Sequence, residues 1–118
     1  MPENRQSIRV NKSLVVSYRI KNQYIGSGSR SKNISIIGIC LPSFQNLEPR
    51  VILELEISLG EDKKPIKTIG EVMWVRRQDN EQFPFEVGIK FVKMDDSTRN
   101  KIIDFIAKES NTEIKWID

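Results

Sequence analysis

The 118-residue sequence has no histidine, and this absence excludes several kinds of chemistry. Without histidine the chain has no imidazole general base and no His-dependent nucleophile, and it lacks the side chain that most often binds metals. Carboxylates remain, but no pair of acids lies in an apolar context that would tune it for proton transfer. The sequence therefore predicts a protein that is not an enzyme and holds neither a metal nor a cofactor.

Cysteine and long apolar runs are also scarce. Cys40 is the one cysteine, so no disulfide can form within the chain, and it is expected to pack in the core. The longest apolar run, residues 34–41, is interrupted by Ser35 and Gly38 and is too short to cross a bilayer. The first residues are polar, unlike a secretory signal. We therefore expect a cytoplasmic protein that does not insert into a membrane.

Negative charge is almost missing from the first part of the chain. Residues 1–47 contain seven Lys or Arg and one acid, a net charge of +6. Residues 48–118 contain twelve Lys or Arg and fifteen Asp or Glu, a net charge of −3. This asymmetry predicts an anionic partner for the N-terminal part of the fold. The total of +3 is small for a protein that binds DNA or RNA, so a small anionic ligand is expected instead.

The apolar pattern predicts short strands. Alternation of apolar and polar residues, bounded by turn-forming residues, is typical of half-buried strands. The predicted strands cover residues 13–20, 31–41, 51–58, 67–77 and 85–92. Residues 25–29 (IGSGS) are predicted as a turn because they are rich in Gly and Ser.

The period changes after residue 94, where a helix is predicted. Asp95 or Asp96 is placed to cap a helix over residues 95–110. The apolar positions of this helix form a stripe that is expected to pack on the sheet: Ile102, Ile103, Phe105 and Ile106. Antiparallel strands followed by one helix predict a small β-barrel with an appended helix.

Two arginines, Arg5 and Arg9, precede the first predicted strand. Arginine donates two-pronged hydrogen bonds to planar anions, so such a pair can form part of an anion site. The alternative is a solvated basic terminus.

A second polar motif follows at residues 33–38 (NISIIG). Because successive side chains of a strand point to opposite faces, Asn33 and Ser35 are expected to project together from the outer surface. Gly38 lacks a Cβ atom and allows either a bulge or a ligand lying against the backbone.

In this order and spacing, the two motifs resemble the PilZ domain family, whose pattern is RxxxR followed by (D/N)xSxxG. Residues 70–74 (GEVMW) resemble the family's GxVxW strand, and residues 87–91 (VGIKF) resemble its closing strand before the helix. The resemblance covers nearly the whole chain. It implies a mostly β fold, a six-stranded antiparallel β-barrel with a C-terminal α-helix.

The resemblance also implies a receptor for cyclic di-GMP, a bacterial second messenger. Its implied ligand-binding residues are Arg5, Arg9, Asn33, Ser35 and Gly38. This ligand suits the residues, because arginine matches the O6 and N7 acceptors of guanine bidentately. Trp74 is either barrel packing or a stacking platform for guanine. Arg76 and Arg77 are either solvated or at the rim of the site.

The expected organisation is a single PilZ-like domain with a flexible ligand-binding arm (1–10), a barrel (12–93) and a helix (95–110). Because the RxxxR motif lies close to the start, no output domain is expected upstream. The signal is therefore expected to pass through a partner protein or through self-association.

Two alternatives remain open at this point. One is a PilZ-like adaptor that does not bind nucleotide and acts only by protein contacts. The other is a small β-barrel that binds single-stranded nucleic acid, although its aromatic side chains should then be exposed, and Phe85 and Phe91 are predicted to face inward.

The family often carries another arginine just before RxxxR, and this chain has Asn4 there. One ligand per chain is therefore expected, rather than a stacked pair. Arg30 and Lys32, near the second motif, are the residues best placed to compensate.

Overall fold

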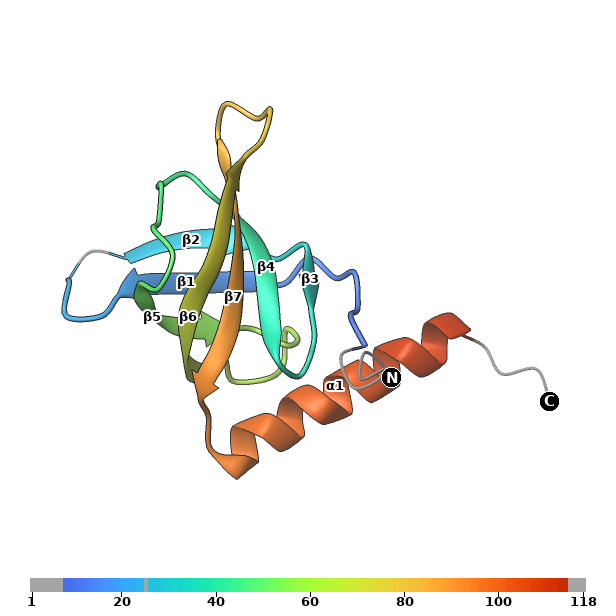
Figure 1. Ribbon diagram of the computed structural model, residues 1–118. Coiled ribbons are helices and arrows are strands. Elements are labelled where there is room, and N and C mark those ends of the chain that lie inside the picture. Colours follow the sequence, from blue (N-terminus) through green and yellow to red (C-terminus); the bar gives the residue numbers. More distant parts are fainter. Residues whose placement is uncertain (1–7, 25, 115–118) are drawn as a thin grey trace, which may run out of the picture.

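The computed structural model describes residues 8–24 and 26–114, which form one antiparallel sheet followed by one helix (Figure 1). The strands are β1 (Val15–Ile20), β2 (Gly26–Arg30), β3 (Asn33–Ile34), β4 (Gly38–Ser43), β5 (Ile52–Ile57), β6 (Ile66–Arg77) and β7 (Phe85–Lys93). The helix is α1 (Asp96–Ile114).

The sheet has the strand order β2-β1-β5-β6-β7-β4-β3. Strands β1 and β2 run across β6, β7 and β4, so the sheet curls into a half-barrel around its own core (Figure 1). The expected mostly β fold with a C-terminal helix is confirmed. The described chain has seven strands instead of six, one of which, β3, is only two residues long.

Two local predictions were wrong. Residues 26–29, part of the turn predicted at residues 25–29, belong instead to strand β2, which pairs with β1 from Val15↔Arg30 to Arg19↔Gly26. The hydrogen bonds of this ladder outweigh the low strand propensity of Gly and Ser. The single strand predicted over residues 31–41 is instead divided into β3 and β4 by a turn at residues 35–37.

The core follows the predicted alternation. Val16 and Tyr18 of β1, Leu53 and Leu55 of β5, and Val87 of β7 are all at most 3% exposed. Side chains with a period of two therefore supply the inner face of the curled sheet, where burial of apolar area stabilises the fold.

Helix α1 starts as predicted. Asp95 is its N-cap, because the Thr98 amide donates a 2.8 Å hydrogen bond to Asp95 Oδ1, and this bond lowers the pKa of Asp95. Its buried side chains are Ile102, Phe105 and Ile106, whereas Ile103 is 40% exposed. The prediction of Ile103 as a packing residue was therefore wrong, because it lies about 100° around the helix from Ile102.

The sheet is anchored near the chain start by Val10, which is 1% exposed. Its amide donates to Ile34 O at 2.9 Å, and the Ile34 amide donates to Val10 O at 3.1 Å. Val10 therefore belongs to the half-barrel and not to the predicted flexible arm. Residues 1–7 of that arm lie outside the described residues. Within the described ranges, no helix is long and apolar enough to cross a membrane.

Candidate functional site

A pocket of about 480 Å³ opens on the outer face of β3, β4, β7 and β6. The strand register places four residues in one row across these strands: Asn33 opposite Cys40, Cys40 opposite Gly88, and Gly88 opposite Trp74. The two central residues are small, while the outer two carry longer side chains. The row therefore forms a low floor between two raised edges.

The two sequence motifs meet at one edge of this pocket. Arg9 NH1 donates a 2.7 Å hydrogen bond to Asn33 Oδ1, although the residues are 24 positions apart. Both residues line the pocket. The structure thus brings together Arg9 and Asn33, two of the residues that the resemblance implies for ligand binding, while Arg5 lies outside the described residues.

Ser35 was wrongly predicted to project from the surface beside Asn33, because its side chain is fully buried. The amides of Ile37 and Gly38 each donate to Ser35 Oγ at 3.2 Å, and the Ser35 amide donates to Gly38 O at 2.8 Å. The strand alternation on which that prediction rested ends at Ile34. The hydroxyl instead closes the turn between β3 and β4.

Gly38 is required by the close approach of β4 to β7. It pairs with Lys90, and a Cβ atom at residue 38 would lie 2.3 Å from Ile89 O. That neighbour is backbone and cannot move aside as a side chain can. Close strand packing therefore explains this glycine, and a bulge is not needed.

Trp74 is both packed and accessible, so the two predicted roles do not exclude each other. A Cβ atom at residue 88 would lie 2.2 Å from Trp74 Cε2, which places the indole directly against Gly88. The residue is still 42% exposed. The Arg76 guanidinium lies 5.5 Å from the ring centroid, within the range of a cation–π contact.

One acidic residue of the pocket, Glu86, was missed by the sequence analysis. It is 4% exposed, and its carboxylate pairs with Lys32 Nζ at 2.6 Å and with Arg76 NH2 at 2.5 Å. The hydrogen bond from Lys32, followed by that from Arg76, holds the pKa of Glu86 below its ordinary value. Burial and the Glu86 charge together raise the pKa of Cys40 to about 11, so this thiol stays neutral at pH 7.

A signal for Glu86 was present in the sequence. Inward positions 85, 87, 89 and 91 place Glu86, Gly88 and Lys90 on the opposite, outer face of the same strand. What the pattern could not show is which residues of neighbouring strands lie beside them.

The described lining residues carry an excess of positive charge: the cations are Arg9, Arg76 and Lys90, and the one carboxylate is Glu86. Such a surface suits an anion. Across residues 8–24 and 26–114, no cluster of three or more Cys, Asp or Glu is placed to hold a metal ion.

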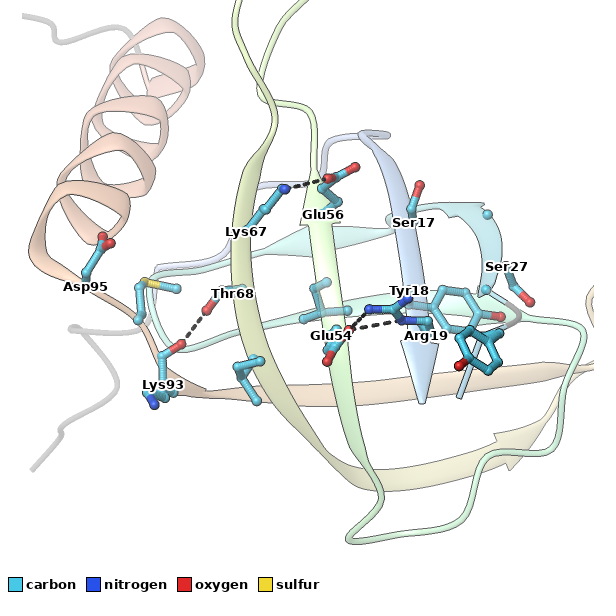
Figure 2. A pocket seen from close by; sticks show the side chains of 16 residues that line it. Ser17, Tyr18, Arg19, Ser27, Glu54, Glu56, Lys67, Thr68, Lys93 and Asp95 are labelled. Carbon is cyan, nitrogen blue, oxygen red and sulfur yellow. Dashed lines mark hydrogen bonds and ion pairs between the residues drawn. The ribbon is translucent and has the colours of Figure 1, made fainter. Parts of the chain in front are cut away.

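A second, larger hollow of about 880 Å³ lies on another part of the sheet, across β2, β1, β5 and β6 (Figure 2). Four of its charged side chains form two ion pairs: Arg19 with Glu54, and Lys67 Nζ with Glu56 Oε2 at 3.6 Å. None of the predicted site residues that the structure describes lines this hollow.

Comparison with protein families decides the affiliation of the chain. The family model of the PilZ domain matches residues 3–108. The chain belongs to the PilZ domain family. A search of curated protein sequences gave no match.

Three solved structures illustrate the similarity in fold. The Bacillus subtilis inhibitor of motility MotI/DgrA matches with a TM-score of 0.77 and 17% identity, over 95% of this chain and 54% of that one. The apo structure of K. pneumonia MrkH matches with a TM-score of 0.77 and 14% identity, over 98% of this chain and 54% of that one. The PilZ domain of Escherichia coli YcgR, solved with c-di-GMP, matches with a TM-score of 0.72 and 9% identity, over 98% of this chain and 100% of that one.

These similarities concern the fold, since all three identities are low. This PilZ domain spans about half the length of the MotI/DgrA and MrkH chains and the full length of the YcgR domain.

Proposed function

We propose that this PilZ domain is a non-catalytic receptor for cyclic di-GMP. The observation that carries the proposal is the hydrogen bond from Arg9 NH1 to Asn33 Oδ1, because it joins the two family motifs at the edge of one positively charged pocket. Membership of the PilZ family and the similar fold of the YcgR domain that was solved with c-di-GMP support this choice of ligand.

The recognition of this ligand is proposed to be divided among Arg5 and residues that line the pocket. Arg5 and Arg9 bind phosphate or the O6 and N7 edge of guanine. Asn33 keeps Arg9 in place and offers its amide to the base. Trp74 presents its exposed ring surface for stacking on guanine, which aromatic side chains accept from any base.

Ser35 and Gly38 contribute through the turn between β3 and β4. The Ser35 hydroxyl holds the turn closed, so direct contact between this buried hydroxyl and a ligand requires the turn to open. Gly38 lets the turn lie close to β7, and its lack of a side chain keeps this part of the pocket shallow.

Binding is proposed to order residues 5–9 around the ligand, and the ordered segment then presents a surface to a partner protein. Fixing five residues costs on the order of 5–10 kcal/mol of backbone entropy, which ligand contacts must exceed. The anchoring of Val10 supports this proposal, since the segment has a fixed end beside the pocket. Amide exchange tests it: residues 5–9 should gain protection with ligand, and unchanged protection would contradict the ordering.

One ligand per chain is proposed. Lys32, one of the two cations considered able to compensate for Asn4, pairs with Glu86 and also donates to Gln78 Oε1 at 3.3 Å. Titration of protein far above the dissociation constant should saturate near one equivalent, and saturation near two would defeat this part of the proposal.

Isothermal titration calorimetry tests the ligand itself. Cyclic di-GMP should bind, while GTP and a short single-stranded oligonucleotide should not. Asn33→Ala should weaken binding about tenfold, as expected for one charge-assisted hydrogen bond. Asn100→Ala, at an exposed position of α1, should bind like the parent. No heat with cyclic di-GMP would favour an adaptor that acts by protein contacts, and heat with the oligonucleotide alone would favour a nucleic-acid-binding barrel.

A further inference from the structure

The buried Glu86 carboxylate organises one end of the pocket. Its Oε2 atom pairs with Lys32 Nζ and accepts a 3.6 Å contact from Cys40 Sγ. Its Oε1 atom accepts a 2.8 Å hydrogen bond from Arg76 Nε and forms an ion pair with Arg76 NH2 at 2.5 Å. Two cations therefore share one carboxylate, which leaves this end with one positive charge in excess.

Arg76 and Arg77 are adjacent in sequence, but their surroundings differ. Arg76 lies opposite Glu86 in the strand register and lines the pocket, while Arg77 lies opposite Phe85, with its guanidinium 5.2 Å from the phenyl ring. Arg77 does not line the pocket and makes no ion pair with any residue that the structure describes. The two arginines thus form a natural test pair on one strand.

Arg76 still has donors to offer. A guanidinium carries five N–H groups; Glu86 accepts the hydrogen bond from Nε and forms an ion pair with NH2. The NH1 group makes no hydrogen bond within residues 8–24 and 26–114, and the side chain is 69% exposed. Its position beside the Trp74 ring places these donors where a stacked base or its phosphate would lie.

We infer that Arg76 is a further ligand-binding arginine of this pocket and that Glu86 is the positioning residue that holds its guanidinium toward the ligand. This inference rests on the proposed function. Preorganisation gives the arrangement its value, because a guanidinium already held in place loses less side-chain entropy when it binds an anion. Lys32 keeps Glu86 neutralised while Arg76 turns its remaining donors to the ligand.

The first test compares Arg76→Ala with Arg77→Ala by calorimetric titration with cyclic di-GMP. Loss of one charge-assisted contact should weaken the affinity of Arg76→Ala about tenfold, and Arg77→Ala should stay within about twofold of the parent. If the parent itself fails to bind, the proposed function is wrong. If the parent binds and Arg76→Ala binds equally well, only the present inference is overturned.

The second test separates positioning from simple charge. Glu86→Gln removes the anchor of Arg76 but raises the positive charge of the pocket, so pure electrostatics predicts tighter binding of an anion. With positioning, Arg76→Ala should cost about tenfold in the parent but less than about threefold in Glu86→Gln, because the arginine is no longer held there. An equal loss of affinity in both backgrounds would show that Glu86 does not position Arg76.

A third variant covers the case in which Arg76→Ala destabilises the protein by leaving Glu86 with one partner. Arg76→Lys keeps a positive charge beside Glu86 but lacks the planar fork. Its thermal unfolding should match that of the parent, while its affinity for cyclic di-GMP should fall at least threefold. Parent-like affinity in this variant would show that Arg76 acts only as a charge and that its held orientation is unimportant.

Discussion

The two hollows of this sheet differ in how their charges are arranged. In the larger one, Arg19 lies opposite Glu54 in the strand register, and Glu56 lies opposite Lys67 (Figure 2). In the smaller one, a single buried carboxylate, Glu86, faces several cations. Size therefore does not distinguish the proposed binding surface from the other hollow, whereas unbalanced charge does.

The paired charges of the larger hollow are explained by their contribution to the stability of the sheet. Opposite charges on directly paired residues stabilise antiparallel strands by about 0.2–1 kcal/mol per pair. Arg19 and Glu54 satisfy each other, so they leave no net charge for a ligand. The smaller hollow has a net positive charge and side chains that are already held in place, which is the condition for binding an anion.

The largest expected difference between the hollows concerns ligand affinity. Arg9→Ala and Arg5→Ala should each weaken cyclic di-GMP binding by about 30- to 150-fold, equivalent to about 2–3 kcal/mol. Arg19→Ala removes an arginine of the larger hollow and should change affinity less than about twofold. Calorimetry of the three variants decides it, and a large loss in Arg19→Ala would move the site to the other hollow.

The next difference concerns one glycine in each hollow. Gly38→Ala places a methyl group against the backbone oxygen of Ile89 and should lower the free energy of unfolding by about 1–3 kcal/mol or more. Gly28→Ala meets nothing closer than Val16 O at 3.9 Å, so its effect should stay within about 0.5 kcal/mol. Urea unfolding measures both, and equal stability of the two variants would contradict the close approach of β4 and β7.

A smaller difference should appear on acidification. The folded-state pKa of Glu86 lies below its ordinary value of 4.5, so ionised Glu86 stabilises the fold above that pH, and this contribution is lost as the pH falls through the lowered pKa. Glu86→Gln should therefore lose less stability than the parent between pH 5 and pH 3. Glu56→Gln, at an ion pair exposed to solvent, should follow the parent, and parallel curves for all three proteins would argue against a buried ion pair at Glu86.

The smallest effect is expected within the larger hollow itself. A double-mutant cycle on Arg19 and Glu54, with both changed to Ala, should give a coupling energy of about 0.2–1 kcal/mol at low salt, because both side chains are exposed to solvent. The coupling should shrink in 1 M NaCl through screening. A coupling of several kcal/mol would mean that the pair is functionally or structurally more important than the comparison of the two hollows allows.

Prediction from the sequence succeeded where the signal was local. Alternation in residues 13–20, 51–58 and 85–92 located three strands, and Asp95 marked the helix start. It failed at Ser35, because a hydroxyl that bonds to the amides of its own turn looks, in sequence, like a surface hydroxyl on a strand. It also failed at β2, where pairing with β1 outweighed local composition.

The candidate site was predicted in part. The spacing of the two motifs indicated Arg9 and Asn33, and the structure brings them together. Glu86 was missed, because a lone glutamate in an alternating strand looks like a solvated residue. Its importance arises only from Lys32 and Arg76, which reach it from other strands or turns.

By itself, the sequence determined the period-two strands, the terminal helix and the two motifs that mark the PilZ family. These features depend on residues close together in the chain, and each can be recognised without knowledge of the others. The tertiary structure alone decided that Cys40 contacts Glu86, 46 residues away, and that Gly88 lies under Trp74. The physical reason is strand register: alternation says which face a side chain occupies, but the packing of the whole core selects its neighbours on that face.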